Sequence, residues 1–261
     1  VSGKINLDFS LRLEDYLYKY NGNSIDNYYY TAIPVVSFAQ SKKDRDPMLG
    51  HKMSISYKFN HFTNFSISYA RGYKAGGANQ QPFLDITNRS FGPEYINNFE
   101  VGFKTIKELS TISITGFYGF RRDQQVSVSS QQDLGNPNSF YFFTGNSGKG
   151  ILRGFEAELV FQVSKFLSTT SSIGFLDTHV EKFSYQTSSG ASYGGNREFA
   201  MAPRLTGALE MQYSKEKTYL RINTSYKSSY YFSDSHDSKS KAYFLSDLTF
   251  GHYFENLNLK F

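Results

Sequence analysis

Residues 52–59, Lys-Met-Ser-Ile-Ser-Tyr-Lys-Phe, alternate strictly between polar and apolar side chains. The pleat of a β-strand sends neighbouring side chains to opposite faces. The segment therefore predicts a strand with one polar face and one apolar face, the latter formed by Met53, Ile55, Tyr57 and Phe59. Such a strand must pair with neighbouring strands that have the same pattern. The resulting sheet needs an apolar environment on one face and a polar environment on the other.

The same alternation recurs along the chain. Apolar residues occupy every second position over most of 5–13, 65–73, 112–120 and 205–213. We therefore predict an all-β fold with a large antiparallel sheet. Its apolar face could contact lipid in a transmembrane β-barrel, or it could cover the core of a water-soluble sandwich. Alternation alone does not choose between these two architectures.

Connection lengths separate the two architectures. Period and turn residues predict strands near 1–18, 50–59, 64–78, 95–106, 110–126, 140–163, 167–182, 200–213, 218–232, 241–254 and from 257 onward. Short connections at 60–63, 107–109, 164–166, 214–217 and 255–256 alternate with long polar ones at 19–49, 79–94, 127–139, 183–199 and 233–240. Outer-membrane barrels alternate periplasmic turns and extracellular loops in this way, and their strands need about 9–11 residues to cross the bilayer.

Composition excludes several function classes. The chain shows no break that would divide 261 residues into domains, and it has no cysteine, which excludes disulfides and thiol chemistry. Its net charge of +5 is scattered, and the densest basic cluster, at 42–46, also contains two aspartates, so no nucleic-acid partner is predicted. The chain opens directly into a strand, and we expect any targeting segment to be removed or to lie outside it.

No catalytic or metal-binding motif is recognisable. The five histidines lie far apart, so we predict no metal site, no cofactor and no enzyme activity. Glu156 and Glu158 share one strand face and could form a carboxylate pair. Acid–base catalysis also needs a pocket and a partner group. Inward-facing charge in a wet or plugged barrel lumen is the interpretation that we favour.

Several segments resemble one family in the same order. Residues 68–79, SYARGYKAGGAN, resemble the "YARGYKAGGFN" segment of TonB-dependent receptors, with Ala78 where Phe is common. Residues 93–104 are similar to that family's "PE…N(Y/F)E(L/V)G(F/L)K" strand, and residues 146–159 to its "N.GK…RGFE.E" strand. Ala-Pro-Arg at 202–204 and the segment 230–235 match later barrel positions. The resemblance spans nearly the whole chain.

The resemblance implies a 22-stranded outer-membrane barrel in a Gram-negative bacterium, filled by an N-terminal plug domain. Such receptors take up scarce nutrients such as ferric siderophores, haem or cobalamin, and the TonB complex powers them through the plug. Residues 1–261 are then expected to be a C-terminal portion of the barrel, with about 10–11 strands and without the plug or the last strand or strands. Phe261, with Leu257 and Leu259, imitates a C-terminal barrel assembly signal, so a self-contained barrel of about ten strands is the alternative.

Ligand contacts are expected in the outward loops. We select Arg89 and Phe91 in 79–94, and Asp234 and His236 in 233–240. Arginine can pair with an anionic chelate and phenylalanine can pack on its apolar part. The alternative is that all four are solvated loop residues. The competing functions are a passive porin-like channel with an open lumen, and a secreted soluble β-protein with an adhesive or structural role.

Overall fold

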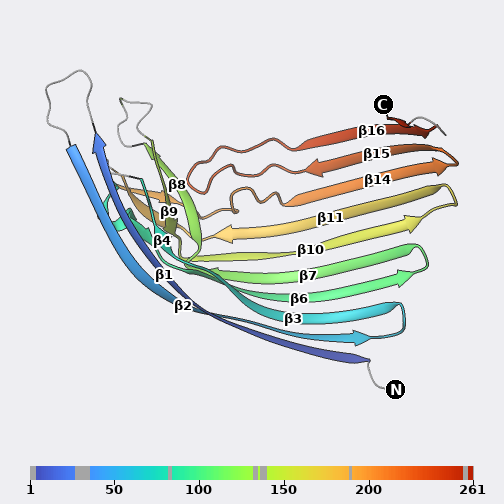
Figure 1. Cartoon of the computed structure of the whole chain (residues 1–261), viewed down its shortest axis with the longest axis horizontal. Coiled ribbons are helices and arrows are strands. Elements are labelled where there is room, and N and C mark those ends of the chain that lie inside the picture. Colours follow the sequence, from blue (N-terminus) through green and yellow to red (C-terminus); the bar gives the residue numbers. More distant parts are fainter. Residues whose placement is uncertain are drawn as a thin grey trace.

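The chain forms one large, curved antiparallel sheet with small hairpins gathered at one end (Figure 1). The computed structural model describes residues 4–26, 36–81, 84–131, 135, 140–187, 190–254 and 258–260. The large sheet has 11 strands, each paired with its neighbours in chain order. They are β1 (Ile5–Asp26), β2 (Val36–Lys58), β3 (Thr63–Lys74), β6 (Glu94–Lys107), β7 (Ser110–Arg122), β10 (Lys149–Gln162), β11 (Leu167–Val180), β14 (Leu205–Lys215), β15 (Thr218–Lys227), β16 (Tyr243–Tyr253) and β17 (Asn258–Lys260).

Three two-stranded sheets complete the fold. They are β4 (Gly77–Ala78) with β5 (Ser90–Phe91), β8 (Gln125–Gln131) with β9 (Phe140–Asn146), and β12 (Phe183–Thr187) with β13 (Gly190–Gly194). One 3-10 turn, η1 (Ile86–Asn88), precedes β5. Among the described residues, no helix is long and apolar enough to cross a membrane.

The large sheet has one apolar and one polar face, as the sequence predicted. Phe9, Met53 and Tyr69 are paired across three adjacent strands, and the Tyr69 ring stacks on Phe99 of the next strand at 4.6 Å between centroids. These side chains are exposed or half-buried, with Phe9 63% and Met53 52% exposed. Within the described part of the chain, no second layer covers this face. The sheet therefore presents a broad apolar surface, unlike a water-soluble sandwich.

One end of the sheet carries tight connections. Asn60 begins the first of these turns, and its side-chain Oδ1 accepts hydrogen bonds from the backbone N–H of Phe62 and of Thr63, both at 2.8 Å. Glu108 and Glu216 begin two-residue turns with positive φ angles of 51° and 52°. The predicted short connections at 60–63, 107–109, 164–166 and 214–217 are confirmed. The one at 255–256 lies outside the described residues.

The prediction of a long loop over 19–49 is wrong. β1 continues to Asp26 and β2 begins at Val36, with the strands paired from Ile5 opposite Tyr57 to Asp26 opposite Val36. On the N-terminal side of His51, β2 is paired with β1 but not with β3, and we call the paired segments 12–26 and 36–50 of these two strands the arm. Backbone pairing extends both strands through this arm, and it does not require alternating apolar residues. Side-chain bonds, such as the one that the Asp46 carboxylate accepts from the Gly76 N–H, add to it. Hydropathy therefore gave no sign of the strands there.

Two other predicted loops contain hairpins. β8 occupies the beginning of the predicted loop at 127–139, and β12 and β13 lie within 183–199. The predicted strand at 140–163 is two strands, because β9 ends at Asn146 and β10 begins at Lys149. β9 returns to pair with β8 instead of continuing the large sheet.

The buried apolar core lies at the hairpin end, not on a face of the large sheet. It consists of Leu84, Val126, Val128, Phe143, Val180, Phe183 and Phe199. Val126, Val128 and Phe143 come from the β8–β9 hairpin, while the others come from neighbouring connections and from the end of β11. The long connections thus pack on one another as a folded unit with its own core.

Candidate functional site

We call this unit the hairpin cluster, comprising the described residues among 75–93, 123–148, 181–204 and 228–242. A buried ion pair joins it to the large sheet. The Glu94 carboxylate at the start of β6 is only 5% exposed and pairs with the guanidinium of Arg121. Its other oxygen accepts a hydrogen bond of 2.8 Å from the backbone N–H of Gln125, where β8 begins. The Arg121 guanidinium also lies 5.3 Å from the centroid of the Phe199 ring. One ion pair therefore links two barrel strands, one hairpin and the core.

Two asparagines attach the 79–92 connection to the outer edge of β9. Buried Asn79 accepts a hydrogen bond from the Thr144 N–H and donates one to the Thr144 carbonyl, both at 2.8 Å. Its side-chain amide thus replaces the peptide group of a neighbouring strand. Asn146 makes the reciprocal arrangement with Gly92, accepting from its N–H at 2.7 Å and donating to its carbonyl at 3.1 Å. Asn79 thus satisfies backbone groups that the edge of β9 otherwise leaves open, and Asn146 satisfies those of Gly92 in the connection.

The opposite edge of the hairpin is covered by the 233–240 connection. The Asp234 carboxylate accepts hydrogen bonds from the N–H of Ser127 in β8 at 3.4 Å and of Ala200 at 3.1 Å. The Ser235 hydroxyl accepts another from the Ser129 N–H at 3.2 Å. The β8–β9 hairpin is therefore held between the two connections that the sequence selected for ligand contact.

A cation–aromatic stack fixes the 233–240 connection. The Tyr231 ring has the Arg197 guanidinium 4.2 Å and the Lys239 ammonium 3.9 Å from its centroid. Arg197 also donates to the Ser233 carbonyl at 2.8 Å and pairs with the Asp237 carboxylate. The Arg197 side chain is only 10% exposed, whereas its partner Asp237 and the Lys239 side chain are exposed. These contacts give the connection a defined conformation.

A cavity of about 370 Å³ opens inside the hairpin cluster, between the connection around η1, strand β9 and strand β12. Apolar walls come from Val128, Phe143, Phe183 and Tyr185, and polar groups come from Thr87, Asn88, Ser90, Thr144, Gly145, Asn146 and Ser184. Mixed apolar walls with a few hydroxyl and amide groups are typical of small-molecule sites. The sequence did not indicate this cavity, because its walls come from connections that are far apart in the chain.

The four selected residues lie in the hairpin cluster in different settings. Arg89 is half-buried, and its Nε donates to the Leu84 carbonyl at 3.0 Å. Phe91 is half-buried in β5, where its ring covers Gly77 so closely that a Cβ there would lie 2.8 Å from it. Asp234 bonds to β8, and His236 is exposed. Arg89 and Phe91 alternate with Asn88 and Ser90, which line the cavity.

A local cap orders the connection beside Arg89. The Asp85 carboxylate accepts hydrogen bonds from the hydroxyl of Thr87 at 2.6 Å and from its N–H at 2.9 Å. These bonds favour the charged carboxylate and lower the pKa of Asp85 below its ordinary value. The contribution of this cap is therefore present above the ordinary aspartate pKa and is lost as the pH falls through the lowered value.

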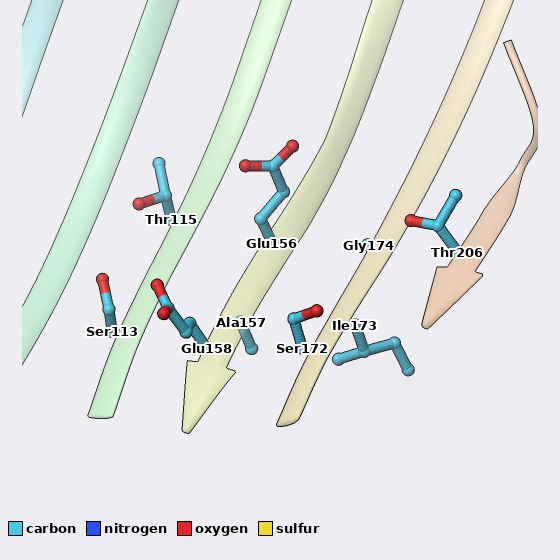
Figure 2. A pocket seen from close by; sticks show the side chains of 9 residues that line it. All are labelled: Ser113, Thr115, Glu156, Ala157, Glu158, Ser172, Ile173, Gly174 and Thr206. Atoms are coloured by element: carbon cyan, nitrogen blue, oxygen red, sulfur yellow. The ribbon is translucent and has the colours of Figure 1, made fainter. Parts of the chain in front are cut away.

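The polar face of the large sheet contains the glutamates noted in the sequence. Figure 2 shows Glu156 beside Thr115, and Glu158 beside Ser113 and Ser172, on adjacent strands. They line an open hollow of about 310 Å³, in which Gly174 lies opposite Glu156 and leaves room for the Thr206 side chain. Its lining includes no histidine, lysine or arginine. Hydroxyl and carboxylate groups thus predominate on this part of the polar face, which we call the polar wall.

A metal centre is not evident in the part of the chain that the structure describes. No three histidine, aspartate or glutamate side chains there come together in a way that could hold an ion. The features on which a functional interpretation can rest are therefore the hairpin cluster, the polar wall and the apolar face.

A sheet that is apolar outside, polar inside and capped at one end by folded hairpins defines the wall of a transmembrane β-barrel. The family model described as "TonB dependent receptor-like, beta-barrel" matches residues 1–261. The chain belongs to this family. Membership places it among receptor barrels rather than enzymes, and the partial barrel architecture predicted from the sequence is confirmed.

Solved structures share the fold at low sequence identity. The ferric yersiniabactin uptake receptor FyuA from Yersinia pestis matches with a TM-score of 0.73 and 15% identity, over 95% of this chain and 35% of its own length. The ferric-catecholate import receptor Fiu from E. coli K12, closed form, gives 0.71 and 14%, over 96% and 36%. The copper transporter OprC gives 0.70 and 12%, over 95% and 38%. This chain thus spans little more than a third of their length. No curated protein matches it.

Proposed function

We propose that this chain is a C-terminal portion of the barrel of a receptor in the outer membrane of a Gram-negative bacterium, and that the whole protein takes up an iron chelate such as a ferric siderophore. Family membership supports the receptor class. Two structural neighbours are named as receptors for ferric chelates, while a third is named as a copper transporter. Haem and cobalamin-type ligands, which the sequence resemblance also implies, are the alternative cargoes.

The observation that carries the proposal is the asymmetry of the two ends. One end has minimal turns, while the other has packed hairpins around a cavity of about 370 Å³. A passive pore requires only an open lumen, whereas a receptor requires a structured surface that recognises its ligand. We assign the hairpin end to the outer surface, because barrels of this kind carry their longer loops there.

Ligand contact is proposed at the cavity and at the four selected residues. Thr87, Ser90 and Tyr185 line the cavity with hydroxyl groups that suit an oxygen-rich chelate. Arg89 would favour an anionic ligand, Phe91 would pack on its apolar part, and the exposed His236 would make a further contact. Asp234 would support ligand binding by holding β8 in place, in addition to any direct contact with the ligand.

Transport is proposed to depend on parts that lie outside this chain. The polar wall with Glu156 and Glu158 would face a plug domain in the lumen, and the plug would connect to the TonB complex of the inner membrane. Strand β1 and the strands after β16 would pair with the remaining strands of a 22-stranded barrel, because open sheet edges are not stable in lipid.

The test is uptake by cells that produce the full-length parent. Accumulation of radiolabelled ferric siderophores should depend on the parent, and should cease when the inner-membrane energy complex is deleted. Uptake that continues unchanged without the energy complex would contradict the proposal and favour a passive channel. A parent that remains soluble without detergent and shows no heat-modifiable gel mobility would favour a secreted β-protein.

A further inference from the structure

Three aromatic rings form one corner of the cavity in the hairpin cluster. The Tyr185 ring lies edge-on to Phe143, with 6.3 Å between centroids and 71° between planes, and it is tilted against Phe183 at 6.1 Å. Phe143 and Phe183 belong to the buried core, whereas Tyr185 is half-buried. Aromatic rings attract each other at such distances. A further ring that entered the cavity would meet ring faces and edges at fixed positions.

Hydroxyl groups on the cavity walls have no partner inside the protein. The hydroxyls of Ser90, Thr144, Ser184 and Tyr185 form no hydrogen bond within the part of the chain that the structure describes. A hydroxyl can both donate and accept a hydrogen bond. These four groups therefore suit the polar substituents of an uncharged ligand, without requiring an ionic group.

Charged side chains do not contribute to the described lining of the cavity. Asp85 is bonded within its own turn, and the Arg89 Nε donates to the Leu84 carbonyl at 3.0 Å. The Lys182 ammonium lies over the Tyr193 ring, 4.2 Å from its centroid. A charged group that entered the cavity would lose water without gaining an ion-pair partner, which is unfavourable. The cavity therefore favours an uncharged group.

Strand pairing holds the walls in place. Tyr185 is paired with Ser192 in the β12–β13 hairpin. The Asn79 side chain bonds both the N–H and the carbonyl of Thr144 at 2.8 Å. Because the walls are already ordered, binding there does not carry the cost of ordering them.

We infer that this cavity binds an uncharged aromatic ring at the edge of the iron chelate, so that the cargo is an aryl-bearing chelate. The inference rests on the proposed function, because it narrows the cargo of the same receptor. The ring would pack against Tyr185 and Phe143, and its substituents would bond to the hydroxyls of Ser90 and Ser184. A cavity of about 370 Å³ admits one ring of a chelate but not the macrocycle of haem or cobalamin.

The experiment compares three metal complexes by isothermal titration into the purified full-length parent. Chromium(III) replaces iron in all three, because it keeps the same charge and exchanges its ligands slowly. The tris(benzohydroxamate) complex is neutral and carries phenyl rings at its edge, the tris(acetohydroxamate) complex is neutral and carries methyl groups, and the tris(catecholate) complex has three negative charges on its ring oxygens. The benzohydroxamate complex should bind about tenfold more tightly than either of the others.

Variants assign this preference to the cavity. Y185L removes the ring and its hydroxyl, and should weaken binding of the benzohydroxamate complex about tenfold while leaving the acetohydroxamate complex unchanged. The matched control is F142L, because Phe142 neighbours Phe143 but is 64% exposed and does not line the cavity. It should bind like the wild type. S184K places a cation at an exposed position of the wall, and should weaken the benzohydroxamate complex and strengthen the catecholate complex.

Heat-modifiable mobility on gels verifies that each variant is folded. Equal affinity of the wild type for the benzohydroxamate and acetohydroxamate complexes, or equal losses in Y185L and F142L, would overturn the inference. Energy-dependent uptake of a ferric trihydroxamate without an aromatic ring, in preference to aryl-bearing chelates, would also overturn it and would leave the proposed function intact. Uptake that ignores the energy complex would instead contradict the proposed function, so the two failures are distinguishable.

Discussion

The two ends of the large sheet differ in how they treat apolar side chains. At the end with short turns, Phe59, Phe62 and Leu109 are 60%, 54% and 70% exposed. At the hairpin end, Val126, Val128 and Phe143 are at most 5% exposed. The turn end leaves its apolar residues for the membrane interface. The hairpin end buries seven apolar side chains in a small core, although it exposes others, such as Ile86 and Phe142. The short turns can form from local sequence alone. The core of the hairpin end forms only when segments far apart in the chain meet.

The largest loss of stability is expected from a substitution at the ion pair that joins the hairpin cluster to the large sheet. R121A would leave the Glu94 carboxylate buried without its partner, at a cost of about 3–5 kcal/mol. The hairpin cluster should then lose protection, seen as faster amide exchange over 125–146 in the purified full-length parent, while 108–115 stays protected. The neighbouring exposed residue supplies the control, since R122A should change neither segment. Equal loss of protection at both ends would show that they are not independent.

The next effect concerns the asparagine that pairs with β9. N79D keeps the acceptor for the Thr144 N–H, removes the hydrogen bonds that the side chain donates to the Asn88 and Thr144 carbonyls, and adds a buried charge. We expect a cost of about 1–3 kcal/mol, confined to the hairpin cluster. Faster exchange at 140–146 and earlier proteolytic cleavage in the cluster would report it. If N79D had no effect on either readout, the Asn79 contacts would not hold this edge.

A comparison within one connection separates structure from binding. D234A removes the acceptor for the Ser127 and Ala200 N–H groups and should cost about 0.5–1.5 kcal/mol, with faster exchange at 125–131. H236A should leave exchange unchanged, because the ring is exposed. Under the proposed function, H236A instead weakens binding of the chelate by isothermal titration. Unchanged binding would remove His236 from the ligand contacts.

The smallest effect is expected in the short turns. Glu216 has a φ of 52°, which glycine adopts without strain. E216G should change stability by less than about 1 kcal/mol, because relief of this strain is offset by the greater freedom of glycine when unfolded. Thermal unfolding of the reconstituted parent measures this. A large loss would indicate that the turn has tertiary contacts of the kind found in the hairpin cluster.

The same difference explains what could be predicted from the sequence. Met53 and Ile55 reveal their face by parity, because lipid exposure acts on every second residue of a spanning strand. The arm beyond Leu49 escaped detection, since Pro47 and the charges at 42–46 read as a loop although β2 continues through them. Backbone pairing with β1 extends the strand there, and contacts such as the bond between Asp46 and the Gly76 N–H depend on residues distant in the chain.

The candidate site was predictable only in part. Connection lengths indicated which loops would lie together at one end of the sheet, and Arg89, Phe91, Asp234 and His236 do lie in the hairpin cluster there. Their individual settings were not predictable, because each depends on a partner distant in the chain, as Asp234 depends on Ser127, 107 residues away. The pairing of Asn79 with Thr144, 65 residues apart, likewise leaves no local pattern.

The most direct measurement of the central claim is thiol labelling on intact cells. Because the chain has no cysteine, single cysteines can be introduced without background from this region. In the full-length parent, H236C at the hairpin end should react with a membrane-impermeant maleimide on intact cells. N60C in a short turn should react only after the outer membrane is permeabilised, and I55C on the apolar face should remain unreactive in both conditions. Labelling of N60C but not of H236C on intact cells, or rapid labelling of I55C, would contradict the assignment of this chain as the wall of an outer-membrane receptor.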